Sequence, residues 1–435
     1  MDSNPLLERN FAIPFDRIKA EHIEPAARQI VAEAEFDLER IVQLQKPRTF
    51  ENTLTALDKA LGKVSYVTKL MDLLESTIIS PEIQEAYNTA MPIIDEFSSK
   101  TFVNAGLWNA LQQYAASCEA SQLEGPRKRF LAKNIELFLR YGANLDEGQK
   151  LHLTEIDVEL GTLTAKYKKN TLDSMNSFSL IIDDPSSLTG LPEREIAAAR
   201  QRAQDKGFEG WRFTLQNSSY LPLMTYLNRR DLREKVYKAF CSIASEGEND
   251  NRHLITEILR LRKEKAKLLG YDNFADMALA DRMAKNGGTA LAFLQDLKDK
   301  SADNFQQEFK ELQEFTSQSE GSKFKLAPWD LAYYSEKLRA AKYNFEEKEL
   351  EQYFSLPNVL EGLFAIVNRL YGIRVEETYE FAIWHKEVKT YKVFDKDDTF
   401  LGAFYADLFT RETKKSGAWM NGLIYGGPDA EGFKP

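Results

Sequence analysis

The chain has 435 residues, with 57 Lys and Arg against 67 Asp and Glu, so its formal net charge is −10. This acidic balance argues against general nucleic-acid or anionic-membrane binding, because both need a basic surface. Its 2 cysteines, Cys118 and Cys241, exclude a disulfide framework and a cysteine-rich zinc site. No apolar run approaches the roughly 18 residues of a membrane span, and the first residues lack a signal-peptide pattern. We therefore expect a globular cytoplasmic protein with no nucleic-acid or membrane partner.

Helical periodicity dominates most of the chain. Apolar residues recur every three or four positions in residues 21–45, 156–167 and 254–261, and the charged stretch 296–320 indicates a solvated helix or helix pair. Asp330 is expected to cap a further helix that reaches Tyr343. Trp329, Tyr333 and Tyr334 at its start are interpreted as core, with the lining of a ligand cleft as the alternative.

Strand signals are few and concentrated near the C-terminus. Residues 177–182 and 211–215 are short candidates, while 388–394 and 400–409 flank the turn 395–398 and predict a hairpin. This turn is not a calcium loop, because Phe400 stands where such a loop needs glycine. The sequence thus predicts a mostly α fold with a small antiparallel sheet near the C-terminus. Composition breaks suggest an N-terminal helical region (1–190), a central helical region (191–380) and a hairpin-containing region (381–435).

The residue types that carry chemistry form no complete active site in the sequence. The four histidines are His22, His152, His253 and His385, and the closest two lie 101 positions apart. A His-Glu-x-x-His zinc helix needs two imidazoles one helical turn apart, and no such pair exists here. The sequence also has no nucleophile elbow and no phosphate-binding loop. Each histidine is therefore interpreted as structural, with slightly more weight on His385 beside Glu387, and the two thiols as buried or inert.

One segment after the hairpin has small residues that would leave its backbone accessible to another chain. Residues 416–420 read Ser-Gly-Ala-Trp-Met, and small residues in a strand let another backbone come close, so that a peptide could add there as an extra strand. Packing against a helix explains the same residues.

These residues, taken together and in order, resemble the thimet-oligopeptidase family of zinc metallopeptidases, in its oligopeptidase A and peptidyl-dipeptidase branch. The matching blocks are 4–7, 14–18, 21–26, 49–53, 213–215, 220–224, 228–234, 269–275, 282–284, 328–334, 353–356, 370–373, 402–407 and 417–420. The resemblance implies a neurolysin-like, elongated, multi-helix body and the hydrolysis of short peptides by a cytoplasmic monomer. It also implies a zinc held by two histidines of a His-Glu-x-x-His helix and by a downstream glutamate.

In that family the zinc helix follows the Gly-Ala-Trp segment by several tens of residues, and the chain as given ends at Pro435. We therefore expect the N-terminal portion of such an enzyme, truncated before its zinc-binding helix. No catalytic residue and no metal ligand is assigned, no zinc is expected to bind this chain, and the chain is expected to be inactive alone. By resemblance, Gly417, Ala418 and Trp419 are expected to bind the peptide substrate through their backbone. The alternatives are a non-catalytic peptide-binding module and a helical fragment with no independent role.

Overall fold

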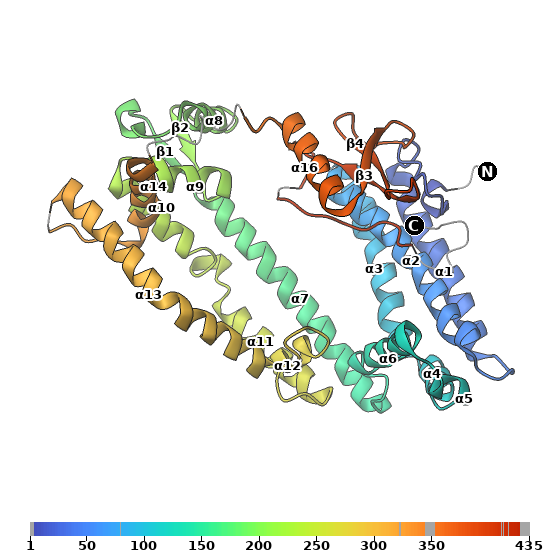
Figure 1. Ribbon diagram of the computed structural model, residues 1–435. Helices are drawn as coiled ribbons and strands as arrows, with labels where there is room; N and C mark the ends of the chain where they lie inside the picture. The colour runs from blue at the N-terminus through green and yellow to red at the C-terminus, as the bar shows by residue number, and fades with distance from the viewer. Residues whose placement is uncertain are drawn as a thin grey trace. The chain divides into compact units, whose positions relative to one another are not determined.

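The structure is a computed structural model that describes residues 4–78, 80–321, 323–343, 353–409, 411, 413–415 and 417–426. The chain forms two compact units (Figure 1). The first unit comprises Met1–Asp146 and Tyr353–Pro435, and the second comprises Glu147–Gln352. The three-region division proposed from composition stays a prediction.

The helical part of the first unit is built on three long helices, α1 (Ile23–Val42), α2 (Ala56–Thr77) and α3 (Pro81–Val103). The periodic apolar residues of α1, including Ile30, Ala34 and Ile41, are buried and join the core of this unit, as the sequence predicted. The remaining helical segments before residue 147 are η1 (Pro5–Leu7), η2 (Ala20–His22), the π-turn η3 (Phe50–Thr55), α4 (Ala105–Ala115), α5 (Cys118–Ser121) and α6 (Gly125–Arg140).

A three-stranded antiparallel sheet completes the first unit. The strands β3 (Arg374–Thr378), β4 (Lys389–Phe394) and β5 (Phe400–Ala406) lie in the order β3-β4-β5. The predicted hairpin is β4–β5, and at its turn Asp398 adopts a left-handed φ of 64° that Asp tolerates better than most residues. β3 was not predicted. It follows α16 (Leu356–Tyr371), which ends at Gly372 in a left-handed C-cap.

The second unit carries the longest helices. Its elements are α7 (Glu147–Ser177), β1 (Leu180–Ile182), η4 (Pro185–Leu188), α8 (Glu193–Gln204), β2 (Trp211–Phe213), α9 (Asn217–Tyr226), α10 (Arg230–Cys241), η5 (Gly247–Asn249), α11 (Arg252–Leu268), α12 (Phe274–Leu279), α13 (Gly287–Glu320), η6 (Pro328–Asp330) and α14 (Leu331–Tyr343). The charged stretch predicted as a helix or helix pair is one helix, α13. The two short strand candidates pair with each other as β1 and β2. The predicted mostly α fold with a small antiparallel sheet near the C-terminus is confirmed.

Asp330 has a larger role in the second unit than the expected helix cap. It accepts a hydrogen bond from the Ala327 amide at 3.0 Å, and its fully buried carboxylate also pairs with Arg230 at 2.7 Å and Arg233 at 3.0 Å. Tyr333 and Tyr334 are buried beside it, so their interpretation as core is confirmed. The network joins α10 to the start of α14.

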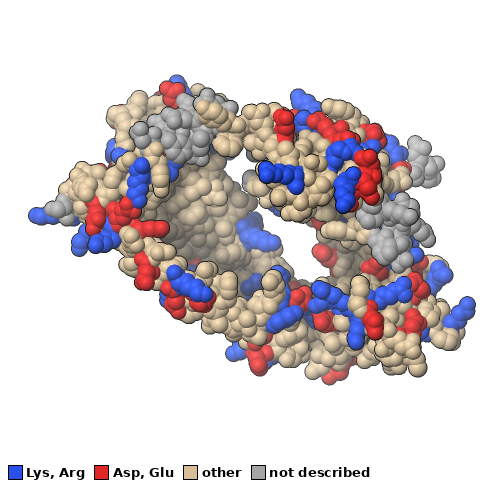
Figure 2. Space-filling view, viewed as in Figure 1, with Lys and Arg blue, Asp and Glu red and all other residues tan. Residues whose placement is uncertain are grey.

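Two observations concern the surface of the described residues. On the face shown in Figure 2, acidic and basic side chains are interspersed. No helix within the described part of the chain combines the length and the apolar character that a membrane span requires.

Candidate functional site

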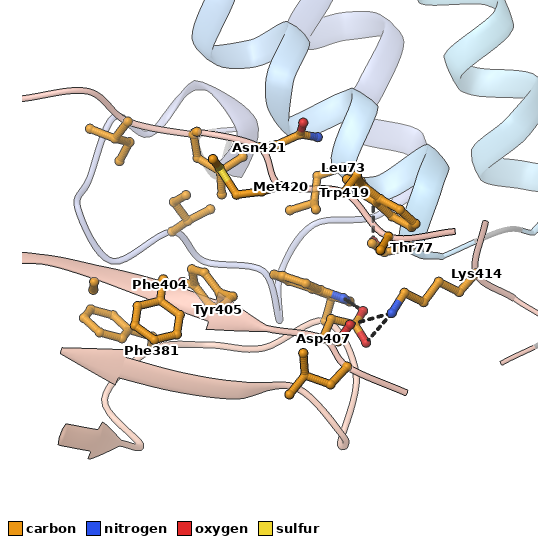
Figure 3. A pocket seen from close by; sticks show the side chains of 18 of the residues that line it. Leu73, Thr77, Phe381, Phe404, Tyr405, Asp407, Lys414, Trp419, Met420 and Asn421 are labelled. Carbon is orange, nitrogen blue, oxygen red and sulfur yellow. Dashed lines mark hydrogen bonds and ion pairs between the residues drawn. The ribbon is translucent and has the colours of Figure 1, made fainter. Parts of the chain in front are cut away.

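A cavity of about 610 Å³ lies within the first unit, between the β5 region and the segment 417–424 (Figure 3). Its lining comes from five stretches of the chain: 11–13, 73–77, 381–384, 403–408, and 414–424 without residue 416. Most of this lining is apolar, and it includes a few polar side chains, among them Asp407, Lys414 and Asn421, which is the usual composition of a ligand site.

Aromatic rings build the sheet side of the cavity. Tyr405 on β5 packs against Trp384, Phe15 and Phe381, with ring centroids 5.1, 5.3 and 6.2 Å away. Its hydroxyl oxygen is buried and has no hydrogen-bond partner among the described residues, and burial raises the pKa of Tyr405. The rings fix one another by edge-to-face and tilted contacts, so this wall is preformed.

Asp407, directly after β5, is surrounded by hydrogen-bond donors. Its carboxylate accepts hydrogen bonds from Trp384 Nε1 at 3.0 Å, Arg411 Nη1 at 2.7 Å and Lys414 Nζ at 3.1 Å. Burial by itself would raise the pKa of Asp407, but these hydrogen bonds and the charge of Arg411 lower it to about 2. Asp407 is therefore a charged anchor and not a proton donor or acceptor near neutral pH.

The segment that carries Arg411, Lys414 and Lys415 is hydrogen-bonded to the C-terminal end of α2. The Thr77 carbonyl accepts a hydrogen bond from Arg411 Nη2 at 2.8 Å, and the Ser76 carbonyl accepts one from the Lys415 amide at 2.9 Å. The last carbonyls of a helix lack partners within the helix, and cations are favourable near them. These contacts hold Arg411 and Lys415 at the end of α2 and so place the segment 417–424 that follows.

Gly417, Ala418 and Trp419, the residues assigned to substrate binding, all line the cavity. Trp419 lies beside Lys414, whose Nζ is 5.7 Å from its ring centroid. The expected strand is wrong, because the described residues 417–426 form no strand and Gly417 has a φ of +106°. The backbone just before them is bonded to the end of α2 instead of to a neighbouring strand. The substrate-binding role of the three residues stays a prediction.

Sequence reasoning missed the other cavity residues, above all Trp384, Tyr405, Asp407 and Lys415. Tyr405 and Asp407 lie in the block 402–407 that carries part of the family resemblance, and this was the one available signal. The residue types alone gave no signal for this site, because the partners of Asp407 lie both before it in the sequence, at Trp384, and after it, at Arg411 and Lys414.

No zinc site is found among the described residues, since no group of three or more His, Cys, Asp or Glu lies together there. His22 accepts a hydrogen bond from the Lys19 amide, His152 bonds to Glu264 at 2.9 Å, and His385 lies 3.7 Å from Glu387. The described residues therefore do not fit the zinc that the family implies, and we assign no catalytic residue. Cys118 and Cys241 are both exposed, so the buried alternative for the thiols is wrong.

Comparisons with known proteins identify the family. A model described as "Peptidase family M3" matches residues 223–434. The chain is 35% identical over 427 residues to oligopeptidase A of Haemophilus influenzae, covering 97% of this chain and 62% of that protein. It is 33% identical over 430 residues to oligopeptidase A of Escherichia coli, covering 97% and 63%, and 30% identical over 431 residues to dipeptidyl carboxypeptidase of Salmonella typhimurium, covering 98% and 63%. The chain belongs to this peptidase family, also called the thimet-oligopeptidase family, and spans somewhat less than two thirds of the length of these relatives.

Proposed function

We propose that this chain forms the peptide-binding body of a zinc-dependent oligopeptidase that hydrolyses short peptides, and that the chain alone does not hydrolyse them. The observation that carries the proposal is the cavity, because the segment that resembles the substrate-binding segment of the family forms one of its walls. Membership of the peptidase family and the relatives named oligopeptidase A and dipeptidyl carboxypeptidase support peptides as the ligand.

The wall offers backbone and one large side chain to a peptide. A Cβ atom placed on Gly417 would meet no atom within 4 Å, so the backbone at this position is open to an approaching chain. Trp419 is 39% exposed and offers an apolar surface beside it. An extended peptide would use the open backbone for hydrogen bonds and the ring for apolar contact.

The catalytic metal is assigned to polypeptide outside this chain. When bound, zinc would polarise the scissile carbonyl and activate a water molecule. The described residues of this chain can bind the peptide, orient it and shield it from solvent. The complete enzyme is proposed to be a cytoplasmic monomer.

Calorimetric titration with an unstructured peptide of about ten residues, the length suited to an extended site, tests the binding role. Trp419→Ala is expected to weaken binding about tenfold, as for the loss of a large apolar contact. Tyr379→Ala is the matched control, because Tyr379 belongs to the same unit, is 90% exposed and does not line the cavity. Absence of binding by the unaltered chain, or equal loss in both variants, would reject the proposed site.

Metal analysis after incubation with zinc, together with a quenched fluorogenic peptide, tests the second half of the proposal. We expect neither stoichiometric zinc nor cleavage. Stoichiometric zinc with cleavage would show that the chain is a complete enzyme. Peptide binding with no cleavage would equally fit a non-catalytic peptide-binding module, and a search for a separate metal-bearing polypeptide that restores cleavage would separate the two.

A helical fragment with no independent role is the second candidate, and α16 is the observation in its favour. Val359, Leu363, Ile366 and Leu370 recur at helical spacing along this helix and are 42 to 65% exposed. Such a stripe normally packs against other apolar residues. Concentration-dependent association without peptide binding would favour this reading.

A further inference from the structure

One methionine of the cavity wall is much more accessible than most methionines of the chain. The chain has 8 methionines, and those that the structure describes fall into two groups. In the second group, Met420 is 87% exposed and Met283 is fully exposed. Because oxidants reach exposed thioethers first, these two are the methionines expected to oxidise. The first group is buried or partly buried and comprises Met71, Met91, Met175, Met224 and Met277.

Of the two exposed methionines, Met420 lies at the cavity. It lines the cavity as part of the segment 417–424 (Figure 3), whereas Met283 lies between α12 and α13 in the second unit. The backbone around Met420 is held on both sides. The Lys415 amide is bonded to the end of α2, and Leu423 packs against the core of the first unit. The position of Met420 in the wall is therefore fixed, while its side chain stays accessible.

Oxidation would change the polarity of this wall. A hydroperoxide transfers one oxygen atom to the thioether sulfur, so that an S=O bond forms and the O–O bond breaks. The sulfur gives up two electrons, and the rest of the peroxide takes the proton of the transferred hydroxyl and leaves as water or an alcohol. The sulfoxide is polar where the thioether was apolar. A peptide that covers it strips water from the new oxygen, and this costs free energy in a mostly apolar lining.

We propose that Met420 is a reversible oxidation site, and that its conversion to the sulfoxide lowers the affinity of the cavity for peptides. This inference rests on the proposed function, because it takes a peptide as the ligand of the cavity. A bound peptide covers the segment 417–424, so the peptide and the oxidant compete for the same side chain. The reverse step belongs to a methionine sulfoxide reductase, which restores the thioether, releases the oxygen as water and oxidises a dithiol to a disulfide.

Oxidation mapping by mass spectrometry tests the site without measuring peptide affinity. The chain is treated with hydrogen peroxide and then with dithiothreitol, which reverses the sulfenic acids and disulfides of the exposed cysteines but not methionine sulfoxide. Met420 and Met283 are expected to gain one oxygen atom before buried Met71 does. A ten-residue peptide without Met or Cys, at about ten times its Kd, is expected to slow the oxidation of Met420 about tenfold, since about one site in ten is then free. The oxidation of Met283 in the same sample is expected to stay unchanged.

Calorimetric titration of the treated chain tests the effect on binding. The oxidised chain is expected to bind the peptide about tenfold more weakly, and methionine sulfoxide reductases of both stereospecificities are expected to restore the affinity. Met420→Leu keeps an apolar side chain of similar volume and is expected to bind equally with and without peroxide treatment. Met283→Leu is the matched control and is expected to keep the full loss. Met420→Gln places a polar side chain in the wall and is expected to show the loss without peroxide.

The outcomes separate this inference from the proposed function. If Met420 oxidises no faster than Met71, or if its oxidation leaves peptide binding unchanged, this inference is wrong while the peptide-binding role stands. An equal loss in Met420→Leu and Met283→Leu would place the sensitive group elsewhere and would overturn the inference as well. If the unaltered chain binds no peptide, the proposed function fails and the effect on affinity fails with it, and the oxidation map alone decides whether Met420 is a modification site.

Discussion

Replacing Asp407 by Asn removes the charge that holds together the cationic side of the cavity. The Asp407 side chain is 8% exposed, and its partners Arg411 and Lys414 are 11 and 10% exposed. Asn has nearly the same shape as Asp but no charge. The variant therefore leaves two poorly hydrated cations without their carboxylate and tests the electrostatic term with little change in packing.

The size of the effect follows from the pKa of Asp407. Burial opposes its ionisation, but the hydrogen bonds from Arg411, Trp384 and Lys414 prevail and lower the pKa from 3.8 to about 2. Because a tenfold change in protonation equilibrium is worth about 1.4 kcal/mol, this difference corresponds to about 2 kcal/mol of stability at neutral pH. A pKa lowered by folding means that this stability is present above about pH 4 and is lost as the pH falls through about 2.

Hydrogen exchange measured by mass spectrometry reports this loss where it occurs. Amide hydrogens in the proteolytic fragments that contain β5 and the end of α2 are expected to exchange about thirtyfold faster in Asp407→Asn, the factor that corresponds to about 2 kcal/mol. Asp37→Asn is the matched control, since Asp37 pairs with Lys63 at 2.8 Å in the same unit but both side chains are about 30% exposed. That pair is expected to contribute less than about 1 kcal/mol. Equal changes in the two variants would refute the role assigned to the Asp407 cluster.

Three further predictions concern stability and surface. Asp330→Asn leaves buried Arg233 without its carboxylate and is expected to lower the free energy of unfolding in urea by about 3–5 kcal/mol, against less than about 1 kcal/mol for Asp231→Asn at an exposed pair. Hydrogen bonds to Glu264 and Glu155 raise the pKa of His152 in the folded protein. The stability that these hydrogen bonds add is therefore complete below about pH 6.5 and is lost as the pH rises through the higher folded-state pKa. His152→Gln is expected to remove this dependence of the urea midpoint on pH. Replacing Leu363 and Ile366 on α16 by Ser is expected to reduce the binding of an apolar-surface dye without lowering the melting temperature.

Each of these predictions has an outcome that contradicts it. Similar urea midpoints for Asp330→Asn and Asp231→Asn would show that the buried network adds little. An unchanged pH slope in His152→Gln would place the titrating group elsewhere. A lowered melting temperature in the α16 double variant would show that the stripe already packs within this chain.

The sequence predicted the helices and the hairpin because each depends on local periodicity and turn chemistry. The apolar spacing of α1, α7 and α11 and the turn at 395–398 are visible without any knowledge of distant partners. β3 was missed because residues 374–378 read Arg-Val-Glu-Glu-Thr, and this polar strand forms by pairing with β4.

The contacts of the buried carboxylates and of the cavity wall were less predictable, because the residues that form them are far apart in the sequence. Asp330 could be interpreted as a cap from its place before a helix, but Arg233 lies 97 positions upstream. Residues 417–420 have the small side chains of a strand that allows close approach, and they adopt another conformation because the segment before them is bonded to the end of α2. Single-sequence patterns carry no information on such pairings.

The Asp407 variant also tests the cavity itself. Asp407 pairs with Arg411 and Lys414, while Arg411 and Lys415 are bonded to the end of α2. Because these residues precede the cavity wall formed by residues 417–424, Asp407→Asn is expected to displace that wall and to weaken the binding of the ten-residue peptide in calorimetric titration. Unchanged peptide binding would show that the wall keeps its place without Asp407.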